Sequence, residues 1–151
     1  MRIMREILFR GRRVDDGEWV EGFYGQFHNR PTIKEPNIHQ IFVLFTEEKE
    51  RENEGHIFSA IGGVWHTIIP ETIGQYTGST DKNGKKIFEG DICQHRSYYS
   101  DNIVISVVTY TDGQFLAMAD ENSGFNLSDK LEIIGNIHDN PELLKGGNNN
   151  A

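Results

Sequence analysis

Short apolar and β-favouring runs, separated by turn-forming pairs, recur along the chain. Three pairs of the Asp-Gly or Asn-Gly type stand between or beside such runs, and pairs of this type accept the positive φ angles of tight hairpin turns. They are Asp16-Gly17, Asn83-Gly84 and Asp112-Gly113. Three hairpin turns of this kind predict a mainly antiparallel β protein.

The predicted strands are short, because each apolar or alternating run holds for only a few residues before the next turn signal. They cover residues 7–9, 19–24, 40–45, 64–69, 87–88, 91–95, 104–110, 114–117 and 132–138. Helical signals are scarce. Asn140 can cap a helix, Pro141 suits the first helical position and Glu142 favours its positive end. The pattern therefore predicts an all-β chain with a short C-terminal helical turn.

A polar run at residues 79–82 divides the predicted strands into two groups. Residues 1–78 are expected to form an N-terminal antiparallel β region. Residues 79–145 are expected to form an SH3-like small β-barrel, since four or five short strands suit a closed sheet of that size. The charged run at 46–56 has no apolar face to bury, so we predict a solvated loop. Residues 146–151 have nothing with which to pack and are expected to be disordered.

The charge balance limits the partners of the molecule as a whole. Of 151 residues, 23 are acidic and 15 are basic, which gives a formal net charge of -8 at pH 7. A charge of this sign repels nucleic acid and anionic membrane, so binding to either would need a local basic patch. The longest apolar run, residues 41–45, is far shorter than the ~18 to 20 residues of a membrane span. No membrane partner is expected.

The compartment is predicted from the cysteine count and from the N-terminal residues. Cys93 is the single cysteine, and a secreted domain of this size would often carry disulfide pairs. Charged residues interrupt the first ten positions, where a secretory signal requires an apolar segment. Both observations favour a reducing, cytoplasmic setting.

Neither metal binding nor catalysis is favoured by the spacing of the reactive residues. No two of the six histidines lie within four positions of each other, and a lone cysteine cannot complete the usual structural zinc sets. Glu89 and Asp91 are predicted on one strand face, but turns and strand edges attract carboxylates anyway. With no phosphate-binding loop and no nucleophile beside a base, we expect a protein without catalytic residues, metal or cofactor. A metal-dependent or hydrolytic enzyme is the third hypothesis.

Partner binding by a protein surface is the leading hypothesis. The run His95-Arg96-Ser97-Tyr98-Tyr99 places an arginine and two aromatic side chains in a predicted loop. With Trp65, these residues form the candidate partner-binding set Arg96, Tyr98, Tyr99 and Trp65. The partner would be an unknown protein or a second copy of the chain.

Nucleic-acid binding is the alternative, because small β-barrels often present strand faces and loops to single strands. The first thirteen residues hold five positive charges with only Glu6 as counterweight. Arg10, Arg12 and Arg13 are the candidate contacts. A contiguous arginine stripe would favour nucleic acid, whereas an aromatic patch without positive charge would favour a protein partner.

Three blocks of the sequence resemble the YopX family of bacteriophage and prophage proteins. The blocks are residues 4–11 with 16–22, residues 74–78 with 81–92, and residues 134–143. Departures from the family pattern are Ser79 in place of an aliphatic residue, Cys93 in place of valine and His138 in place of tyrosine. The resemblance implies an all-β fold with an SH3-like barrel in the C-terminal part and an origin in phage or prophage genomes, so that the expected cytoplasm is that of a bacterial host. It implies no function, since none is established for the family.

Overall fold

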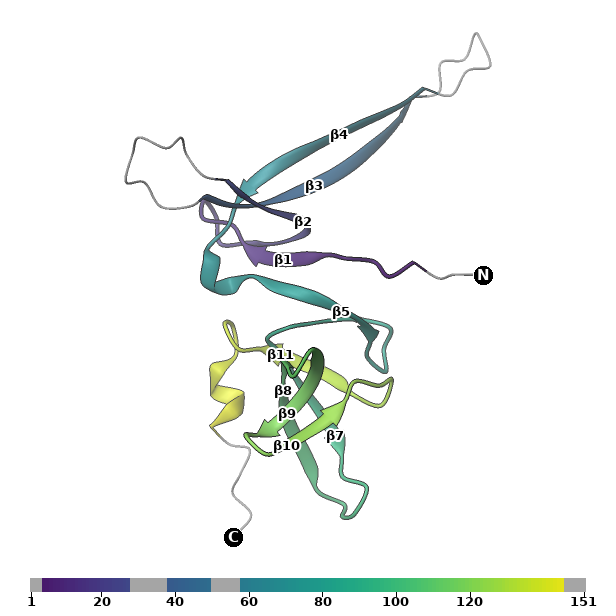
Figure 1. Cartoon of the computed structure of the whole chain (residues 1–151), viewed down its shortest axis with the longest axis vertical. Coiled ribbons are helices and arrows are strands. Elements are labelled where there is room, and N and C mark those ends of the chain that lie inside the picture. The colour runs from purple at the N-terminus through teal and green to yellow at the C-terminus, as the bar shows by residue number, and fades with distance from the viewer. Residues whose placement is uncertain (1–3, 28–37, 50–57, 146–151) are drawn as a thin grey trace. The chain divides into compact units, whose positions relative to one another are not determined.

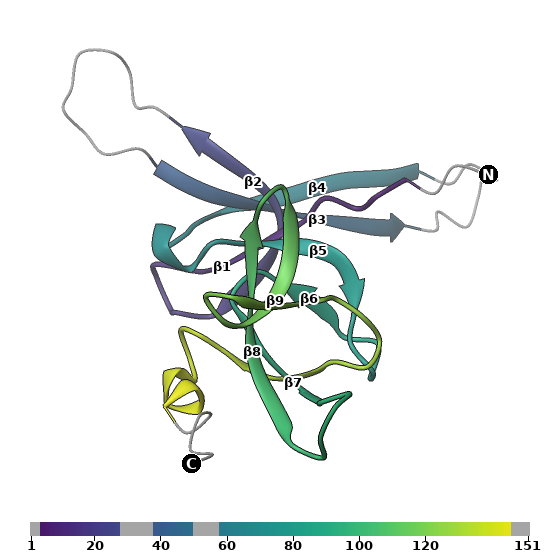
Figure 2. The ribbon, with the colours of Figure 1, turned by 60° about the horizontal axis from the view of Figure 1, so that its bottom comes forward.

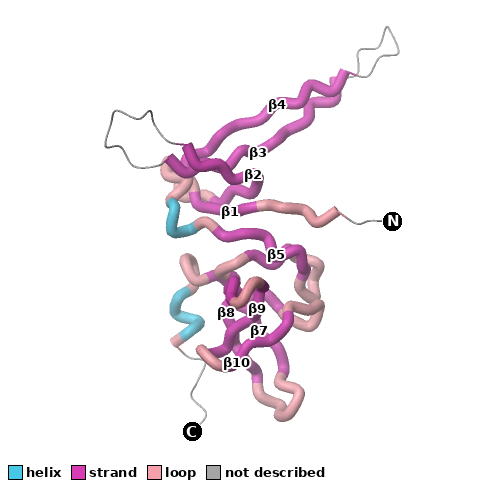
Figure 3. Tube along the Cα trace, in the orientation of Figure 1, coloured by secondary structure: helices cyan, strands magenta, loops and turns pink. Residues whose placement is uncertain are grey.

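The computed structural model describes residues 4–27, 38–49 and 58–145. Antiparallel strands dominate the described chain (Figure 1). Helical structure in the described part is limited to two short 3-10 turns, η1 (Pro70–Thr72) and η2 (Pro141–Leu144), which are cyan in Figure 3. The all-β prediction is therefore confirmed, and η2 begins at the predicted Pro141. No described helix has the length and apolar character needed to cross a membrane.

The chain divides into two compact units. One unit is Leu8–Ile73, and the other joins Met1–Ile7 to Gly74–Ala151. The boundary expected between residues 78 and 79 lies inside strand β5 (Gly74–Thr80). Residues 79 and 80 continue this strand in spite of their polar composition, because backbone pairing does not depend on the side chain.

The Leu8–Ile73 unit is one antiparallel sheet. Its strands are β1 (Phe9–Arg12), β2 (Trp19–Phe27), β3 (Ile38–Lys49) and β4 (Phe58–Thr67), in the order β4-β3-β2-β1. Ile41 and Ile68 are fully buried on one side of this sheet. A Cβ atom at Gly11 would collide with the Ile68 side chain, so the absence of a side chain there lets β1 lie against that core.

The charged run at 46–56 was predicted as a loop, and the structure corrects part of that prediction. Residues 46–49 belong to β3 and pair in register with residues 58–61 of β4, from Thr46↔Ile61 to Lys49↔Phe58. Residues 50–57 lie outside the described chain. The physical reason is that a partner strand satisfies backbone N–H and C=O groups whatever the side chains are, so pairing outweighs a weak strand propensity.

The second unit contains a hairpin and a larger antiparallel sheet. The hairpin is β5 with β6 (Lys86–Phe88). The sheet has the order β10-β9-β8-β7-β11. Its strands are β7 (Asp91–Arg96), β8 (Ile103–Thr111), β9 (Gln114–Asp120), β10 (Ser123–Asn126) and β11 (Glu132–Asn136). Among the described pairings none joins β10 to β11, so this sheet is open and the predicted SH3-like barrel is not confirmed.

The core of the second unit lies against its five-stranded sheet. Five buried side chains form this core: Ile87, Cys93, Val108, Ala117 and Leu131. The partly buried Phe125, Leu127 and Ile133 pack against it. The Cys93 thiol is inside this core, as the strand pattern predicted. The β8–β9 turn has positive φ at Asp112 (50°) and Gly113 (79°), the geometry for which Asp-Gly pairs are selected.

Candidate partner-binding site

The predicted tyrosine loop closes the hairpin formed by β7 and β8, which Figure 2 shows side by side. The last strand pair is Arg96↔Ile103, and the Ser97 N–H then donates to the Asn102 carbonyl at 2.9 Å. Inside the loop, the Tyr99 N–H donates to Ser97 Oγ at 3.2 Å. Tyr98 is 70% exposed and Tyr99 is 100% exposed. These hydrogen bonds hold two aromatic side chains out in solvent, where a partner can reach them.

A pocket of about 480 Å³ lies beside this loop, within the second unit. We call it the Tyr98 pocket. Residues of β7, its loop and the β10–β11 region line it: His95, Arg96, Tyr98, Gly124, Phe125, Asn126, Ser128, Lys130 and Leu131. The pocket thus brings together two predicted residues, Arg96 and Tyr98. Tyr99 is not among the lining residues, although it lies next to Tyr98 in the same loop.

The rim of the Tyr98 pocket is cationic. Lys130 Nζ lies 5.1 Å from the centre of the Tyr98 ring and 3.4 Å from its hydroxyl oxygen, so a cation–π contact holds the ammonium group at the mouth. Arg96 lies on the same rim and reaches Asp101 at 3.5 Å, with both side chains largely exposed. None of the nine lining residues is a carboxylate. The pocket therefore favours an anionic group at its mouth.

The wall of the pocket contains a buried histidine. His95 is 8% exposed, and neither ring nitrogen has a hydrogen-bond partner among the described residues. Its ring meets Phe125 edge-on, with 4.6 Å between ring centroids. Burial lowers the pKa of His95, so the ring is neutral near pH 7 and carries one N–H donor and one nitrogen acceptor.

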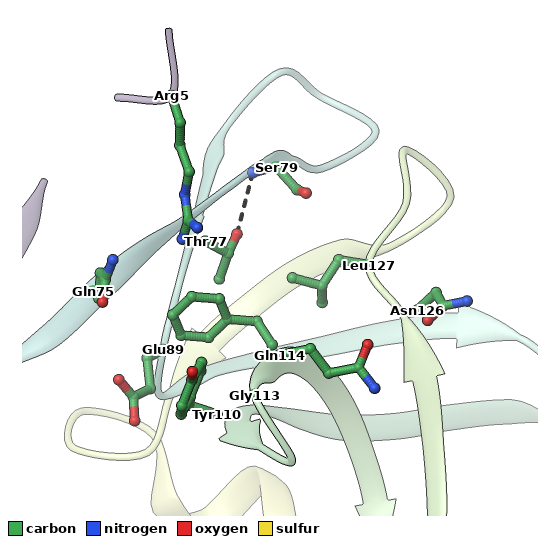
Figure 4. A pocket seen from close by; sticks show the side chains of 11 residues that line it. Arg5, Gln75, Thr77, Ser79, Glu89, Tyr110, Gly113, Gln114, Asn126 and Leu127 are labelled. Atoms are coloured by element: carbon green, nitrogen blue, oxygen red, sulfur yellow. Dashed lines mark hydrogen bonds between the residues drawn. The ribbon is translucent and has the colours of Figure 1, made fainter. Parts of the chain in front are cut away.

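A second pocket, of about 680 Å³, lies on the same unit and is drawn in Figure 4. Arg5, Glu89 and Tyr110 are among the side chains that line it. None of the residues selected from the sequence as a binding site lies in it. Glu89 occupies the turn before β7, whereas Asp91 is buried in β7 and accepts the Phe88 N–H at 2.8 Å. The two carboxylates predicted on one strand face therefore lie in different elements, and Asp91 stabilises the turn between β6 and β7.

Trp65 lies in the other unit, on an aromatic face of its sheet. The register Phe23↔Phe42↔Trp65 places these three side chains on one side of β2, β3 and β4. The Trp65 ring packs 4.7 Å from Phe42 and, edge-on, 5.0 Å from Phe27. Trp65 is still 45% exposed. We define this aromatic face by its residues: Trp19, Phe23, Phe27, Phe42 and Trp65.

Of the three predicted arginines, two lie on this face and the third lies at the β1–β2 turn. The register Arg12↔Trp19 and Arg10↔Glu21 puts Arg10 and Arg12 on the side of Trp19. Their guanidinium carbons lie 5.1 and 5.6 Å from the centre of a Trp19 ring. Arg13 instead donates through Nε to Asp16 Oδ1 at 2.8 Å. Arg13 therefore stabilises the β1–β2 turn, apart from the other two.

Metal ligands do not converge in the described chain, where no three His, Cys, Asp or Glu side chains could hold one ion. Two of the six histidines, His28 and His56, lie outside the described residues.

Sequence reasoning did not select Lys130, Phe125 or His95 for the pocket. Alternation along β7 carried a signal for His95, because Asp91, Cys93 and His95 are successive inward positions and all three are buried. Lys130 is 32 residues from Tyr98 in the chain. No local pattern predicts that contact, since it depends on how β10 and β11 return to the sheet.

Comparison with known proteins identifies the family. The chain resembles the crystal structure of protein EF1440 from Enterococcus faecalis. The two share 25% sequence identity and a TM-score of 0.56, over 93% of this chain and 99% of that one. No curated protein matches the chain. The model of the family described as YopX protein matches residues 8–145, which is most of the sequence. The chain therefore belongs to the YopX family.

Proposed function

We propose that this chain is a non-enzymatic accessory protein that binds a segment of a partner protein at the Tyr98 pocket. One observation carries the proposal: an exposed tyrosine loop stands beside a pocket with aromatic walls. The two cations on its rim have Asp101 and Asp129 beside them, so they do not form the contiguous arginine stripe expected of a nucleic-acid site. Tyrosine and arginine are among the residues that contribute most to protein interfaces, because they offer large contact areas with polar ends.

The loop is also well prepared for binding. Its ends are joined by the Ser97–Asn102 hydrogen bond, and Lys130 is held against Tyr98 before any partner arrives. A surface ordered in advance loses less side-chain and backbone entropy on association. More of the contact energy is then available for affinity.

The test is a pull-down from bacterial lysate, treated with nuclease, using the wild-type protein and the double variant Y98A/Y99A. We expect the variant to retain the fold, since both side chains are exposed, and to lose the captured partner. Tyr110→Ala is the matched control, because Tyr110 is a 55% exposed tyrosine of the same unit that does not line the Tyr98 pocket.

Capture of the same proteins by wild type and by Y98A/Y99A would remove this loop from the proposal. The same loop is tested for self-association, in which the partner is a second copy of the chain. Sedimentation velocity of the purified protein measures it directly, and Y98A/Y99A should shift the distribution toward the monomer.

A single-stranded nucleic acid is the second candidate partner, and the aromatic face supports it. Arg10 and Arg12 lie over Trp19 on the same side of the sheet as the partly exposed ring of Trp65. Stacking rings beside positive charge are the usual means of binding single strands without base specificity. The net charge of -8 opposes such binding except at this local site.

Its test is the salt dependence of binding to a fluorescent oligothymidine. Loss of two phosphate contacts in R10S/R12S should reduce the slope of log K against log salt by about 1.4. Arg13→Ser is the control, because Arg13 is engaged with Asp16. An affinity that does not change with salt would exclude this second candidate.

Three finer expectations belong to the same proposal. A phage or prophage origin is supported by membership in the YopX family. A cytoplasmic setting is supported by the single buried Cys93. An SH3-like arrangement of the second unit is supported by the presence of a five-stranded antiparallel sheet together with the β5–β6 hairpin.

A further inference from the structure

The chemistry of the Tyr98 pocket identifies the group that it accepts. Its volume of about 480 Å³ falls in the range of pockets that enclose a small molecule or a few side chains, roughly 300 to 1,000 Å³. The interior is formed by Phe125 and Leu131, with the His95 ring edge-on to Phe125. Flat apolar groups pack well in such a space, because edge-to-face and offset ring contacts add to the burial of apolar area.

His95 supplies a polar requirement inside this apolar space. A buried polar atom without a hydrogen-bond partner lowers stability by about 1 to 3 kcal/mol. Both ring nitrogens of His95 are in that state among the described residues. Both nitrogens are covered in the unliganded protein, so a donor or acceptor of a ligand reaches the ring only through a shift of the pocket wall, and a purely apolar ligand leaves the ring unsatisfied.

The rim supplies the charge requirement. Lys130 is fixed by Tyr98, and Arg96 lies on the same rim. Exposed carboxylates stand next to both cations in the sequence or in space, namely Asp129 beside Lys130 and Asp101 at 3.5 Å from Arg96. A single carboxylate can meet Lys130 alone. A nucleic-acid strand presents a phosphate at every nucleotide and would also meet the two aspartates.

We propose that the Tyr98 pocket binds an aromatic side chain that is followed by a single carboxylate, as part of a segment of a partner protein. The ring enters beside Phe125, its polar edge meets His95, and the carboxylate pairs with Lys130. Tyr98 acts as a positioning residue, because it holds the Lys130 ammonium in place. This inference rests on the proposed function, and it names the chemistry of the partner.

The experiment is an NMR titration of the full-length protein with short capped peptides. Ac-Trp-Glu-NH2 carries a side-chain carboxylate, Ac-Gln-Trp-OH carries a terminal carboxylate, and Ac-Trp-Gln-NH2 carries none. The readouts are the imidazole resonances of His95 and the backbone amides of Gly124 and Ser128. We expect at least one carboxylate peptide to shift these signals and to bind about tenfold more tightly than the neutral peptide. The preferred one identifies the source of the carboxylate.

Two variants test the assigned roles. Lys130→Met should weaken the carboxylate peptide about tenfold and leave the neutral peptide unchanged, whereas Lys145→Met, which lies outside the pocket, should change neither. His95→Leu should weaken all tryptophan peptides without lowering the free energy of unfolding, because it removes a polar group that lacks a partner. A merely structural histidine would leave peptide affinity unchanged.

The outcomes separate this inference from the proposed function. Equal binding of charged and neutral peptides, or no shift of the His95 signals, overturns the inference. A short oligothymidine that shifts these signals when the peptides do not would replace it with nucleic-acid binding. If Y98A/Y99A loses its partner in the pull-down but no peptide binds, partner binding stands and the proposed chemistry of an aromatic side chain with one carboxylate is wrong. If the peptides bind but Y98A/Y99A captures the same proteins as wild type, the chemistry of the pocket stands and partner binding through the tyrosine loop is wrong.

Discussion

Asp81 shows how one buried carboxylate connects distant parts of the second unit. It is 3% exposed, and its Oδ1 accepts the N–H groups of Asn83 and Lys85, both at 2.9 Å. Its Oδ2 accepts the Ile133 N–H from β11 at 3.1 Å. Burial acts to raise the pKa of Asp81, but these hydrogen bonds and the charge of Lys85 outweigh it, so the pKa is lowered.

Replacement of Asp81 should therefore be costly. Asp81→Ala leaves three N–H groups without their acceptor, and we expect the free energy of unfolding to fall by about 3 kcal/mol. Urea denaturation at pH 7 measures it. Asp129→Ala, at an exposed aspartate, should change it by less than about 0.5 kcal/mol. Equal midpoints for the two variants would show that water replaces the Asp81 carboxylate.

At the scale of elements, tight turns determine where the strands reverse. The β8–β9 turn pairs Thr111 with Gln114, which leaves only Asp112 and Gly113 between the strands. A residue with a Cβ atom is strained in the left-handed region that Gly113 occupies. Space is not the constraint, because nothing lies within 4 Å of the Cβ position there.

The backbone strain predicts the effect of a substitution. Gly113→Val should lower the free energy of unfolding by about 1 to 2 kcal/mol, with the native fold retained. Thermal unfolding followed by circular dichroism measures the loss, and Gln114→Val is the control at a neighbouring exposed position with ordinary strand geometry. A Gly113→Val protein as stable as wild type would mean that the turn relaxes to another conformation at no cost.

The same scale explains the error at residues 46–49. Their side chains carry no strand pattern, yet they continue β3 because β4 offers a matching backbone in register. Long-range pairing is invisible to a local reading of charge.

The whole molecule responds to acid through two kinds of group. The His95 ring has a lowered pKa because of burial. Among the described residues, three carboxylates also have lowered pKa values: Asp81; Asp120, through the Asn122 N–H and Ser123; and Glu132, through Lys82 and Gln94. In both cases the unfolded chain binds protons at a pH where the folded chain does not, so stability falls as pH falls.

Two windows of acid destabilisation follow. The contribution of His95 should begin below about pH 6.5, the ordinary histidine value, and that of the carboxylates below about pH 4. Urea midpoints at pH 7.5, 5.5 and 3.5 measure both. His95→Leu should remove the decline between pH 7.5 and 5.5 and keep the later one. The net charge of both proteins approaches zero near the pI of 5.2, so their comparison cancels the change in self-repulsion. Parallel curves would contradict the role of His95.

The sequence by itself determined the class of the fold and the positions of several turns. Asp-Gly and Asn-Gly pairs have local conformational preferences, so the turns at Asp16-Gly17, Asn83-Gly84 and Asp112-Gly113 could be predicted without any partner. The helical start at Pro141 and the burial of Cys93 in a strand follow from equally local rules. Three recurrent blocks also sufficed to indicate the family.

Tertiary structure alone decided the composition of the candidate site. Tyr98 and Arg96 could be selected as an aromatic and cationic loop, but Lys130 and Phe125 reach them only because β10 and β11 fold back beside β7. Trp65 was grouped with Tyr98 by residue type, and the fold assigned it to the other unit. Tertiary structure also determines that the five-stranded sheet stays open and that the buried ring of His95 has no hydrogen-bond partner among the described residues. Contacts between distant residues depend on strand pairing and chain return, which no local pattern of side chains encodes.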